Sequence, residues 1–209
     1  MFEVLINAIV DGDEDDAAAA VEELLAGGIA AVTIINDGLI AAMNKVGELF
    51  REGELFVPEV MLAANITAEQ IEVLKPYLGA EQPVCLAKVV IGTVKGDLHD
   101  IGKNLVSLML ANSGFNVINL GMDVPPEEFC RVVRDEGVQI VAMSALLTTT
   151  MPMMAEVIKQ LQAEGLREQV KVIIGGAPVS AEYAERIGAD GYSPDAAGAV
   201  ALCKQLIKE

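Results

Sequence analysis

The spacing of apolar residues changes near residue 80, from a helical repeat to short apolar runs. Before that point apolar residues recur every three or four positions, which is typical of amphipathic helices. The third helical segment shows this spacing on one face, at Ile35, Leu39, Met43, Val46 and Phe50. We therefore expect a small antiparallel bundle of four helices joined by short turns, over about 2–10, 14–26, 29–51 and 58–78.

Residues with special backbone or capping properties mark the ends of these helices. Asp13 is placed to cap the second helix, and Gly27 with Gly28 is a typical helix stop. Pro58 falls in the first turn of the fourth helix, where a missing N–H is tolerated. These signals favour the helical interpretation of the first 82 residues.

After Pro83, short apolar runs alternate with helical stretches. Strands are expected at 86–92, 116–120, 140–144 and 170–174, with a weaker fifth near 190–192. Helices are expected between them, at 101–113, 126–136, 151–164, 181–187 and 196–207. This alternation predicts an α/β domain over 83–209: a flavodoxin-like, Rossmann-type parallel sheet of order 2-1-3-4-5, covered by helices on both faces.

Charge and composition exclude several classes of protein. The 209 residues carry a formal net charge of −17, which repels phosphates and argues against nucleic acid or an anionic membrane as a partner. No apolar stretch approaches the ~18 residues that cross a bilayer. Met1-Phe2-Glu3 lacks the basic region of a secretory signal, and three cysteines form no CxxC pair. We expect a cytoplasmic protein with reduced thiols.

The only histidine, His99, directly follows the first predicted strand and its loop. Asp97 precedes it by two positions and Asp100 follows it. Such a histidine can bind a metal ion while a carboxylate holds its second ring nitrogen. In the expected sheet, ligands bind at the carboxyl ends of strands 1 and 3. The polar run from Ser144 to Thr150 and the pair Gly175-Gly176 follow strands 3 and 4, so these loops fall at the same edge.

Together these loops resemble the cobalamin-binding domains. The shared pattern is Asp97-x-His99-x-x-Gly102, then Ser144-x-Leu146, then Gly175-Gly176. The helical half, with the run Phe56-Val57-Pro58-Glu59-Val60-Met61, resembles the methionine-synthase-like capping bundle of methyl-transferring corrinoid proteins. Stretches at 121–129 and 189–192 are similar to free-standing corrinoid subunits of methanogens and acetogens, so the resemblance covers nearly the whole chain.

The resemblance implies a bound corrinoid, cobalamin or a close relative, with His99 as the lower axial ligand of its cobalt. Asp97 would accept a hydrogen bond from Nδ1 of His99, and Thr150 would hydrogen-bond Asp97. Ser144, Gly175 and Gly176 would line the channel of the nucleotide tail. Further residues expected near the cofactor are Asp100, Ile101, Gly102, Leu146 and Thr148. Phe56, Met61 and Leu62 would cover the face that carries the methyl group.

The implied activity is methyl transport by the corrinoid subunit of a methyltransferase system, rather than by a complete enzyme. Cobalt(I) would accept a methyl group from a substrate-specific methyltransferase and deliver it to a second methyltransferase with a folate or thiol acceptor. A reductive activator would be a third partner. The donor and the acceptor would be determined by these partner enzymes of anaerobic one-carbon metabolism.

Other interpretations stay open at this point. The α/β domain could belong to the cobalamin subunit of a radical mutase, or to a light-sensing cobalamin regulator, although no basic helix-turn-helix precedes residue 1 and the negative charge opposes the latter. Asp97, His99 and Asp100 could form a hydrolytic divalent-metal site. Thr148 and Thr149 could simply end a buried strand, and Phe56, Met61 and Leu62 could be bundle core.

Overall fold

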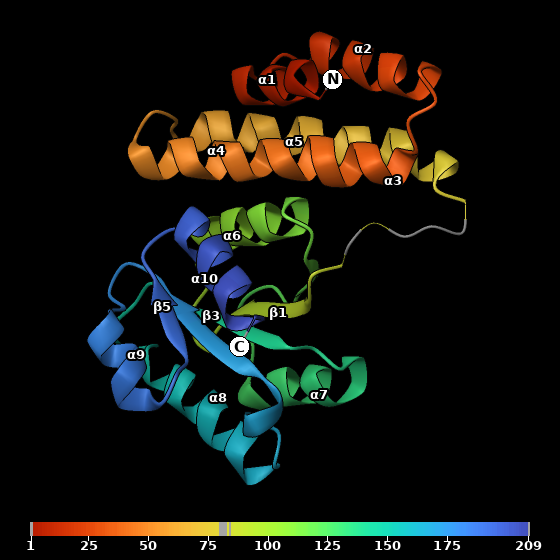
Figure 1. Ribbon diagram of the computed structural model, residues 1–209. Helices are drawn as coiled ribbons and strands as arrows, with labels where there is room; N and C mark the ends of the chain where they lie inside the picture. Colours follow the sequence, from red (N-terminus) through yellow and green to blue (C-terminus); the bar gives the residue numbers. More distant parts are fainter. Residues whose placement is uncertain (1, 80–82, 84, 209) are drawn as a thin grey trace. The chain divides into compact units, whose positions relative to one another are not determined.

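The chain divides into two compact units in the computed structural model, which describes residues 2–79, 83 and 85–208 (Figure 1). One unit consists of Met1–Cys85 with Ala111–Gly114, and the other of Leu86–Leu110 with Phe115–Glu209. The domain boundary expected between residues 82 and 83 involves residues outside the described ranges, and it stays a prediction.

The first unit is helical, as its apolar spacing predicts. Its elements are α1 (Glu3–Asp11), α2 (Glu14–Ala26), α3 (Ala31–Thr33), the π-helical segment η1 (Ile34–Leu39), α4 (Ile40–Glu52), α5 (Val57–Leu74) and the 3-10 turn η2 (Lys75–Tyr77). α3, η1 and α4 follow one another without a break and correspond to the expected third helix. The expected fourth helix is correct to Leu74, after which the last turn tightens to 3-10 geometry.

The π-helical segment in the third helix was not predicted. It contains Gly38, where a Cβ atom would come within 2.8 Å of Leu5 Cδ2 on α1. A π segment widens a helix by one residue per turn and re-aims the side chains around it. The segment carries part of the unit's core, because Ile34, Ile35 and Leu39 are fully or almost fully buried.

The expected helix starts are confirmed in detail. Oδ1 of Asp13 accepts a hydrogen bond from the Asp16 amide at 3.0 Å, which caps α2. At the start of α5, the Glu59 carboxylate accepts a hydrogen bond from the Phe56 amide at 2.7 Å, and Pro58 lies in the first turn. These contacts satisfy amides that the helices themselves cannot pair.

The second unit contains the parallel sheet that the sequence predicts. Its strands are β1 (Lys88–Thr93), β2 (Asn116–Asn119), β3 (Ile140–Ser144), β4 (Lys171–Gly175) and β5 (Gly191–Ser193). They pair in parallel in the order β2-β1-β3-β4-β5. Thr93 is in register with Ser144, Ser144 with Gly175, and Gly175 with Ser193, so the carboxyl ends of four strands share one edge.

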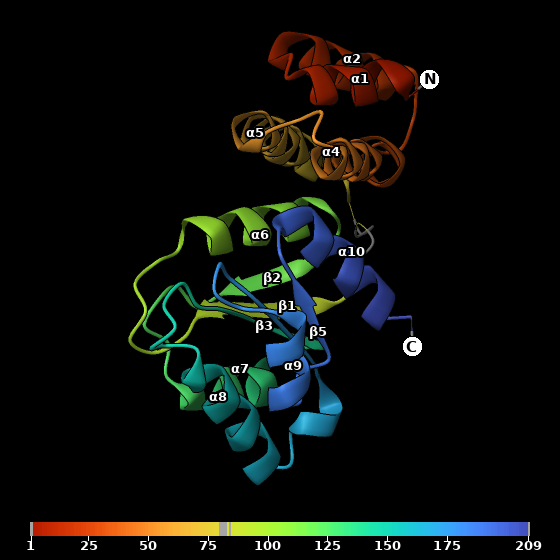
Figure 2. The same ribbon diagram turned by 90° about the vertical axis from the view of Figure 1, so that its left-hand side faces the viewer.

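Helices cover both faces of this sheet. They are α6 (Ile101–Asn112), α7 (Pro126–Glu136), α8 (Pro152–Ala163), α9 (Ala181–Ile187) and α10 (Ala196–Leu206), with a 3-10 turn η3 (Arg167–Gln169). Figures 1 and 2 show α6 and α10 on one face and α7, α8 and α9 on the other. Phe129 of α7 and Leu161 of α8 are fully buried in the core against that second face. Among the described residues, no helix is long and apolar enough to span a membrane.

Candidate functional site

The loops after β1, β3 and β4 leave the sheet from one common edge. Val94, just past β1, donates its amide to the Ser144 carbonyl at 3.0 Å, and Ala145 donates to the Gly175 carbonyl at 3.3 Å. The sheet pairing thus continues into the loops themselves. This continuity fixes the backbone on which the candidate site residues are carried.

Asp97 and His99 form the centre of the site. Nδ1 of His99 lies 2.8 Å from Oδ1 of Asp97, and the same oxygen accepts the His99 amide at 3.1 Å. The Asp97 side chain is fully buried, whereas that of His99 is 52% exposed. With Nδ1 in contact with the carboxylate, the ring's other nitrogen, Nε2, is the one available to a ligand.

The second oxygen of Asp97 is bound by the loop that follows β3. Oδ2 accepts hydrogen bonds from Thr150 Oγ1 at 2.7 Å, from the Leu146 amide at 2.8 Å and from the Leu147 amide at 3.2 Å. The hydrogen bond that the family resemblance implies between Thr150 and Asp97 is therefore present. Leu146 contributes through its backbone, so its identity as a leucine is not what this contact requires.

These donors determine the charge of Asp97. Burial by itself raises the pKa of this carboxyl group, because a buried charge loses its hydration. The hydrogen bonds from Thr150, His99 and the Leu146 amide outweigh burial, and the pKa lies well below its ordinary value. Asp97 is therefore an ionised acceptor, which favours a proton on Nδ1 of His99.

Two further residues that sequence reasoning missed support the same segment. Thr93, buried at the end of β1, donates from Oγ1 to the His99 carbonyl at 3.0 Å. Asp123, in the loop between β2 and α7, accepts the Gly96 amide on Oδ1 at 2.7 Å and donates its own amide to the Asp97 carbonyl at 3.0 Å. Asp123 lies in the stretch 121–129 that carries part of the family resemblance, but neither residue could be given a role from the sequence, because each acts on a backbone group several or many residues away.

Asp100 belongs to a polar network at the start of α6. Its Oδ2 accepts from Asn104 Nδ2 at 2.9 Å, and the Lys103 ammonium donates to Asn104 Oδ1 at 2.6 Å and to Asn119 Oδ1 at 2.8 Å. Lys103 is only 3% exposed, and burial lowers its pKa although the charge of Asp100 opposes that effect. This network ties the start of α6 to the end of β2.

The two glycines after β4 allow a close approach of two loops. A Cβ atom on Gly176, whose φ is +125°, would lie 1.9 Å from the Ala145 carbonyl oxygen. A Cβ atom on Gly175 would lie 3.0 Å from the Ser193 carbonyl oxygen. Side chains are excluded here by backbone on the neighbouring strands, so both glycines are required by the packing of the edge itself.

Large apolar side chains are exposed in the loops around His99. Leu98 is 68% exposed and Ile101 is 83% exposed, while Leu146 and Leu147 are each more than 40% exposed. Gly102 is also exposed, and a Cβ atom there would meet nothing within 4 Å. Exposed apolar residues grouped in this way mark an interaction surface, for a ligand or for a partner protein. Thr148 and Thr149 are exposed as well, and Ser144 is half-buried at the end of β3.

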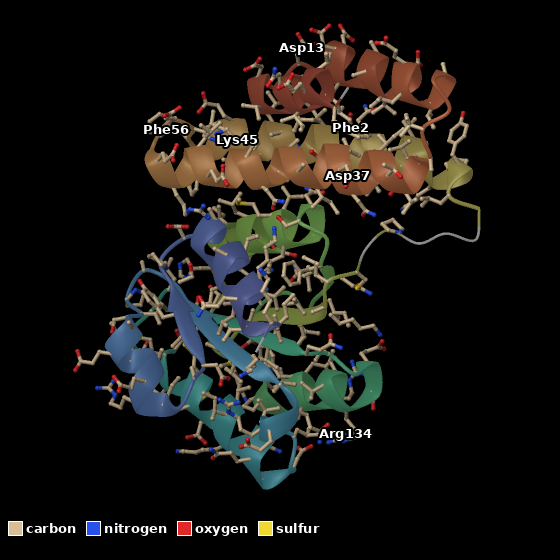
Figure 3. The ribbon with its side chains drawn as sticks, in the orientation of Figure 1. Phe2, Asp13, Asp37, Lys45, Phe56 and Arg134 are labelled. Atoms are coloured by element: carbon tan, nitrogen blue, oxygen red, sulfur yellow. The ribbon has the colours of Figure 1, made fainter. Side chains whose placement is uncertain are left out.

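The three residues expected to cover the cofactor lie at the start of α5. Phe56 is 66% exposed, Met61 45% and Leu62 46%, and Figure 3 labels Phe56 where the helix begins. This exposure rules out a purely structural role for Phe56 in the bundle core. Leu62 also packs within the bundle, because its Cδ2 is 2.7 Å from where a Cβ atom on Gly12 would lie.

Comparison with known proteins identifies the family. Two family profiles, both described as a B12 binding domain, match residues 87–201 and residues 1–75. The chain belongs to the B12-binding corrinoid proteins. It is 43% identical over 203 residues to trimethylamine corrinoid protein 1 of Methanosarcina acetivorans, covering 96% of this chain and 94% of the relative. It is 42% identical over 208 residues to dimethylamine corrinoid protein 1 of the same organism, covering 99% and 97%.

Solved structures of B12-binding proteins share the fold along the whole chain. A cobalamin-binding protein from Desulfitobacterium hafniense DCB-2 superposes with a TM-score of 0.83 at 38% identity, covering 98% of both chains. The methanol:cobalamin methyltransferase complex from Methanosarcina barkeri contains a chain that superposes with a TM-score of 0.88 at 34% identity, covering 99% of this chain and 79% of that one. The cofactor of this corrinoid protein is therefore cobalamin or a related corrinoid.

The residues at the sheet edge fit such a cofactor. An imidazole whose Nδ1 is held by a carboxylate suits a transition metal, and the exposed apolar side chains around His99 suit a broad, largely apolar macrocycle. A small hydrolytic metal site is not supported: within the part of the chain that the structure describes, no three His, Cys, Asp or Glu side chains gather as a possible metal site. Asp97 already accepts five hydrogen bonds and Asp100 is turned to Asn104.

Proposed function

We propose that this corrinoid protein is a methyl carrier, which receives a methyl group from a substrate-specific methyltransferase and gives it to a second methyltransferase with a folate or thiol acceptor. The names of its relatives support this proposal. Two relatives are a trimethylamine corrinoid protein and a dimethylamine corrinoid protein, and one similar solved structure is a methanol:cobalamin methyltransferase complex. A separate reductive activator completes the set of partners. When bound, the corrinoid supplies a cobalt ion that accepts and releases the methyl group.

The hydrogen bonds around Asp97 carry this proposal. Both carboxylate oxygens are occupied by donors, and one of these donors is Nδ1 of His99. The ring is thereby held in position with Nδ1 facing the carboxylate, and Nε2 would be the atom that holds the metal. A ligand of this kind can detach and reattach if its proton can be exchanged, and the Asp97 carboxylate is the group in contact with that proton.

Coverage of the helical unit favours a carrier over the alternative functions. The relatives match at least 96% of this chain, and a B12 binding profile matches residues 1–75 by itself. A radical mutase subunit does not need such a unit, and no described feature favours a light sensor. The relatives' names include two different methylamines, and the solved complex acts on methanol. We therefore propose that the partner enzyme selects the methyl donor, which a panel of donors and co-purified partners would identify.

His99→Ala tests the central claim. The variant protein should still bind cobalamin, because Ser144 and Gly175-Gly176 would retain the nucleotide tail, but its absorption spectrum should change to the base-off form. Asp97→Asn should have a smaller effect, leaving a ligated imidazole that detaches more easily at mildly acidic pH. Thr149→Ala is the control, since Thr149 is exposed in the neighbouring loop, which follows β3.

The single histidine makes the assay specific. Protein labelled with ¹⁵N only at histidine should show an altered nitrogen coupling in the electron paramagnetic resonance spectrum of the reduced, paramagnetic cofactor. That coupling can come from His99 alone, because the chain has 1 His. Retention of a base-on spectrum in His99→Ala, with cobalamin bound, would show that another group ligates cobalt and would refute this reading of the loop.

We also propose that Phe56, Met61 and Leu62 shield the bound cofactor from water and oxygen. Replacing the three with serine should accelerate the air oxidation of the reduced cofactor, since apolar cover excludes water from a reactive centre. Val73→Ser is the control, because Val73 is 47% exposed on the same helix, α5. Equal oxidation rates in the triple variant and the control would contradict the shielding role.

A further inference from the structure

We propose that Asp123 is a positioning residue, which holds the backbone of the Asp97–His99 segment in the geometry that ligation by His99 requires. This inference depends on the proposed function of His99 as a metal ligand. Asp123 itself lies on a different loop, between β2 and α7, and is not part of the pattern Asp97-x-His99-x-x-Gly102. It acts on that segment through two hydrogen bonds.

The two hydrogen bonds of Asp123 grip consecutive residues of the neighbouring loop. Its Oδ1 accepts the Gly96 amide at 2.7 Å, and its amide donates to the Asp97 carbonyl at 3.0 Å. Asp97 N in turn donates to the Val94 carbonyl at 3.1 Å, which closes a tight turn with Gly96 at φ +83°. Asp123 therefore stabilises the turn that places the Asp97 carboxylate beside His99.

Asp123 adopts an unusual backbone conformation in order to make these bonds. With φ +55°, it is the one non-glycine residue of positive φ among the residues described. Aspartate and asparagine tolerate this region better than other non-glycine residues, yet it stays sparsely populated and persists where the surroundings determine it. Such an outlier beside a candidate ligand is the observation that a positioning role explains.

The flanking backbone determines this conformation. Val94 and Val124 form an isolated parallel bridge, and the Val124 amide donates to the Thr93 carbonyl at 3.0 Å. The Thr93 amide donates to the Gly121 carbonyl, also at 3.0 Å. Backbone hydrogen bonds thus hold the loop on both sides of Asp123. In this conformation the Asp123 carboxylate faces the Gly96 amide.

Asp97 is consequently held from two directions. The loop after β3 binds its carboxylate through Thr150, Leu146 and Leu147, whereas Asp123 binds its carbonyl and the preceding amide. If the contact between the Asp123 carboxylate and the Gly96 amide is removed, the Asp97 carboxylate stays paired, but the turn that precedes Asp97 loses one of its two supports from Asp123. The amide and Nδ1 of His99 both contact Oδ1 of Asp97, so His99 should then lose its fixed orientation.

Three substitutions separate the hydrogen bond from the backbone conformation. Asp123→Asn keeps both the acceptor oxygen and the tolerance of positive φ, so it should resemble the unmodified protein. Asp123→Gly adopts positive φ freely but lacks the acceptor. Asp123→Ala lacks both. We expect the Asp97–His99 segment to be less well ordered in the glycine variant, and less ordered still in the alanine variant. If the alanine variant does not fold, the glycine variant still tests the proposal.

The first measurement uses the full chain without cofactor. Hydrogen exchange of the Gly96 amide should be about tenfold faster in Asp123→Gly, which corresponds to about 1.4 kcal/mol, at the upper end of the range for a neutral hydrogen bond and just below the range for a charged acceptor. The ring ¹⁵N signals of the only histidine should move towards a mixture of tautomers. The asparagine variant should leave both the exchange rate and the ring signals unchanged.

The second measurement uses the same variants with cobalamin bound and histidine labelled with ¹⁵N. The nitrogen coupling to the metal should weaken or vary in Asp123→Gly and persist in Asp123→Asn. An unmodified protein without any such coupling would refute the proposed function, whatever Asp123 does. Normal coupling together with unchanged Gly96 exchange and ring signals in the glycine variant would overturn the positioning role, as would an asparagine variant as disturbed as the glycine variant.

Discussion

Replacing Thr150 with valine removes one hydrogen bond from the buried carboxylate of Asp97 and changes little else in shape. The lost hydroxyl lies 2.7 Å from Asp97 Oδ2 and 2.9 Å from the Leu147 carbonyl oxygen, so its single proton is shared between two acceptors; Thr150 is 7% exposed and Asp97 is fully buried. Hydrogen bonds to charged groups contribute about 1.5–3 kcal/mol. Because Oδ2 of Asp97 keeps two amide donors, from Leu146 and Leu147, we expect the lower part of that range, about 1.5–2 kcal/mol of lost stability at pH 7.

Urea unfolding followed by tyrosine circular dichroism measures this loss in the α/β unit. Tyr183 is a suitable probe, since it is buried and its hydroxyl donates to the Met151 carbonyl at 2.7 Å, one residue beyond Thr150. Thr149→Val, at an exposed position, should change stability by less than about 0.5 kcal/mol, and Thr150→Ser should recover most of the loss. If Thr150→Val were as stable as Thr149→Val, the hydrogen bond would not stabilise the carboxylate as we argue.

Two further perturbations test the charge of Asp97 and the glycine at the sheet edge. Since the pKa of Asp97 is lowered by folding, the unfolded chain binds a proton there between about pH 4 and the lower folded pKa, and stability falls as the pH falls through that range. Below about pH 4, the free energy of unfolding of Asp97→Asn should therefore change less steeply with pH than that of the unmodified protein. The difference in slope should correspond to the uptake of up to about one proton on unfolding, and an unchanged slope would contradict the assigned charge. Gly176→Ala should lose about 3 kcal/mol or more, because the new Cβ would overlap the Ala145 carbonyl. Gly165→Ala, at φ +70° with open space around it, should lose only about 1 kcal/mol in the same urea titration.

The architecture and the centre of the site follow from local signals in the sequence. Apolar runs separated by helical stretches predict the sheet and its order. Asp13 predicts the start of α2, because an aspartate side chain caps a helix directly. Parallel topology then brings the loops of His99, Ser144 and Gly175 to one edge, because the carboxyl ends of the strands must meet there. These predictions succeed because each depends on short segments and one general rule of topology.

The supporting contacts could not be predicted, because each forms between segments that are far apart in the sequence and meet only in the folded protein. Asp123 meets Gly96 only after β2 has paired with β1. Lys103 would be expected at the surface of an amphipathic helix, yet it is buried by the end of β2 and paired with Asn119. The π-helical turn at Gly38 depends on packing against α1, which a helical repeat by itself cannot reveal.

The use of main-chain donors by the loop after β3 leaves the leucine side chains free to vary. The amides of Leu146 and Leu147 bind the Asp97 carboxylate, while both side chains are more than 40% exposed. Any residue except proline, which has no N–H, supplies the same donor. Descendants of this chain, or a designer, can therefore reshape the surface that faces a ligand at these two positions without disturbing the charge that orients the histidine. The exposed side chains can diversify here while the contacts between Asp97 and His99 stay unchanged.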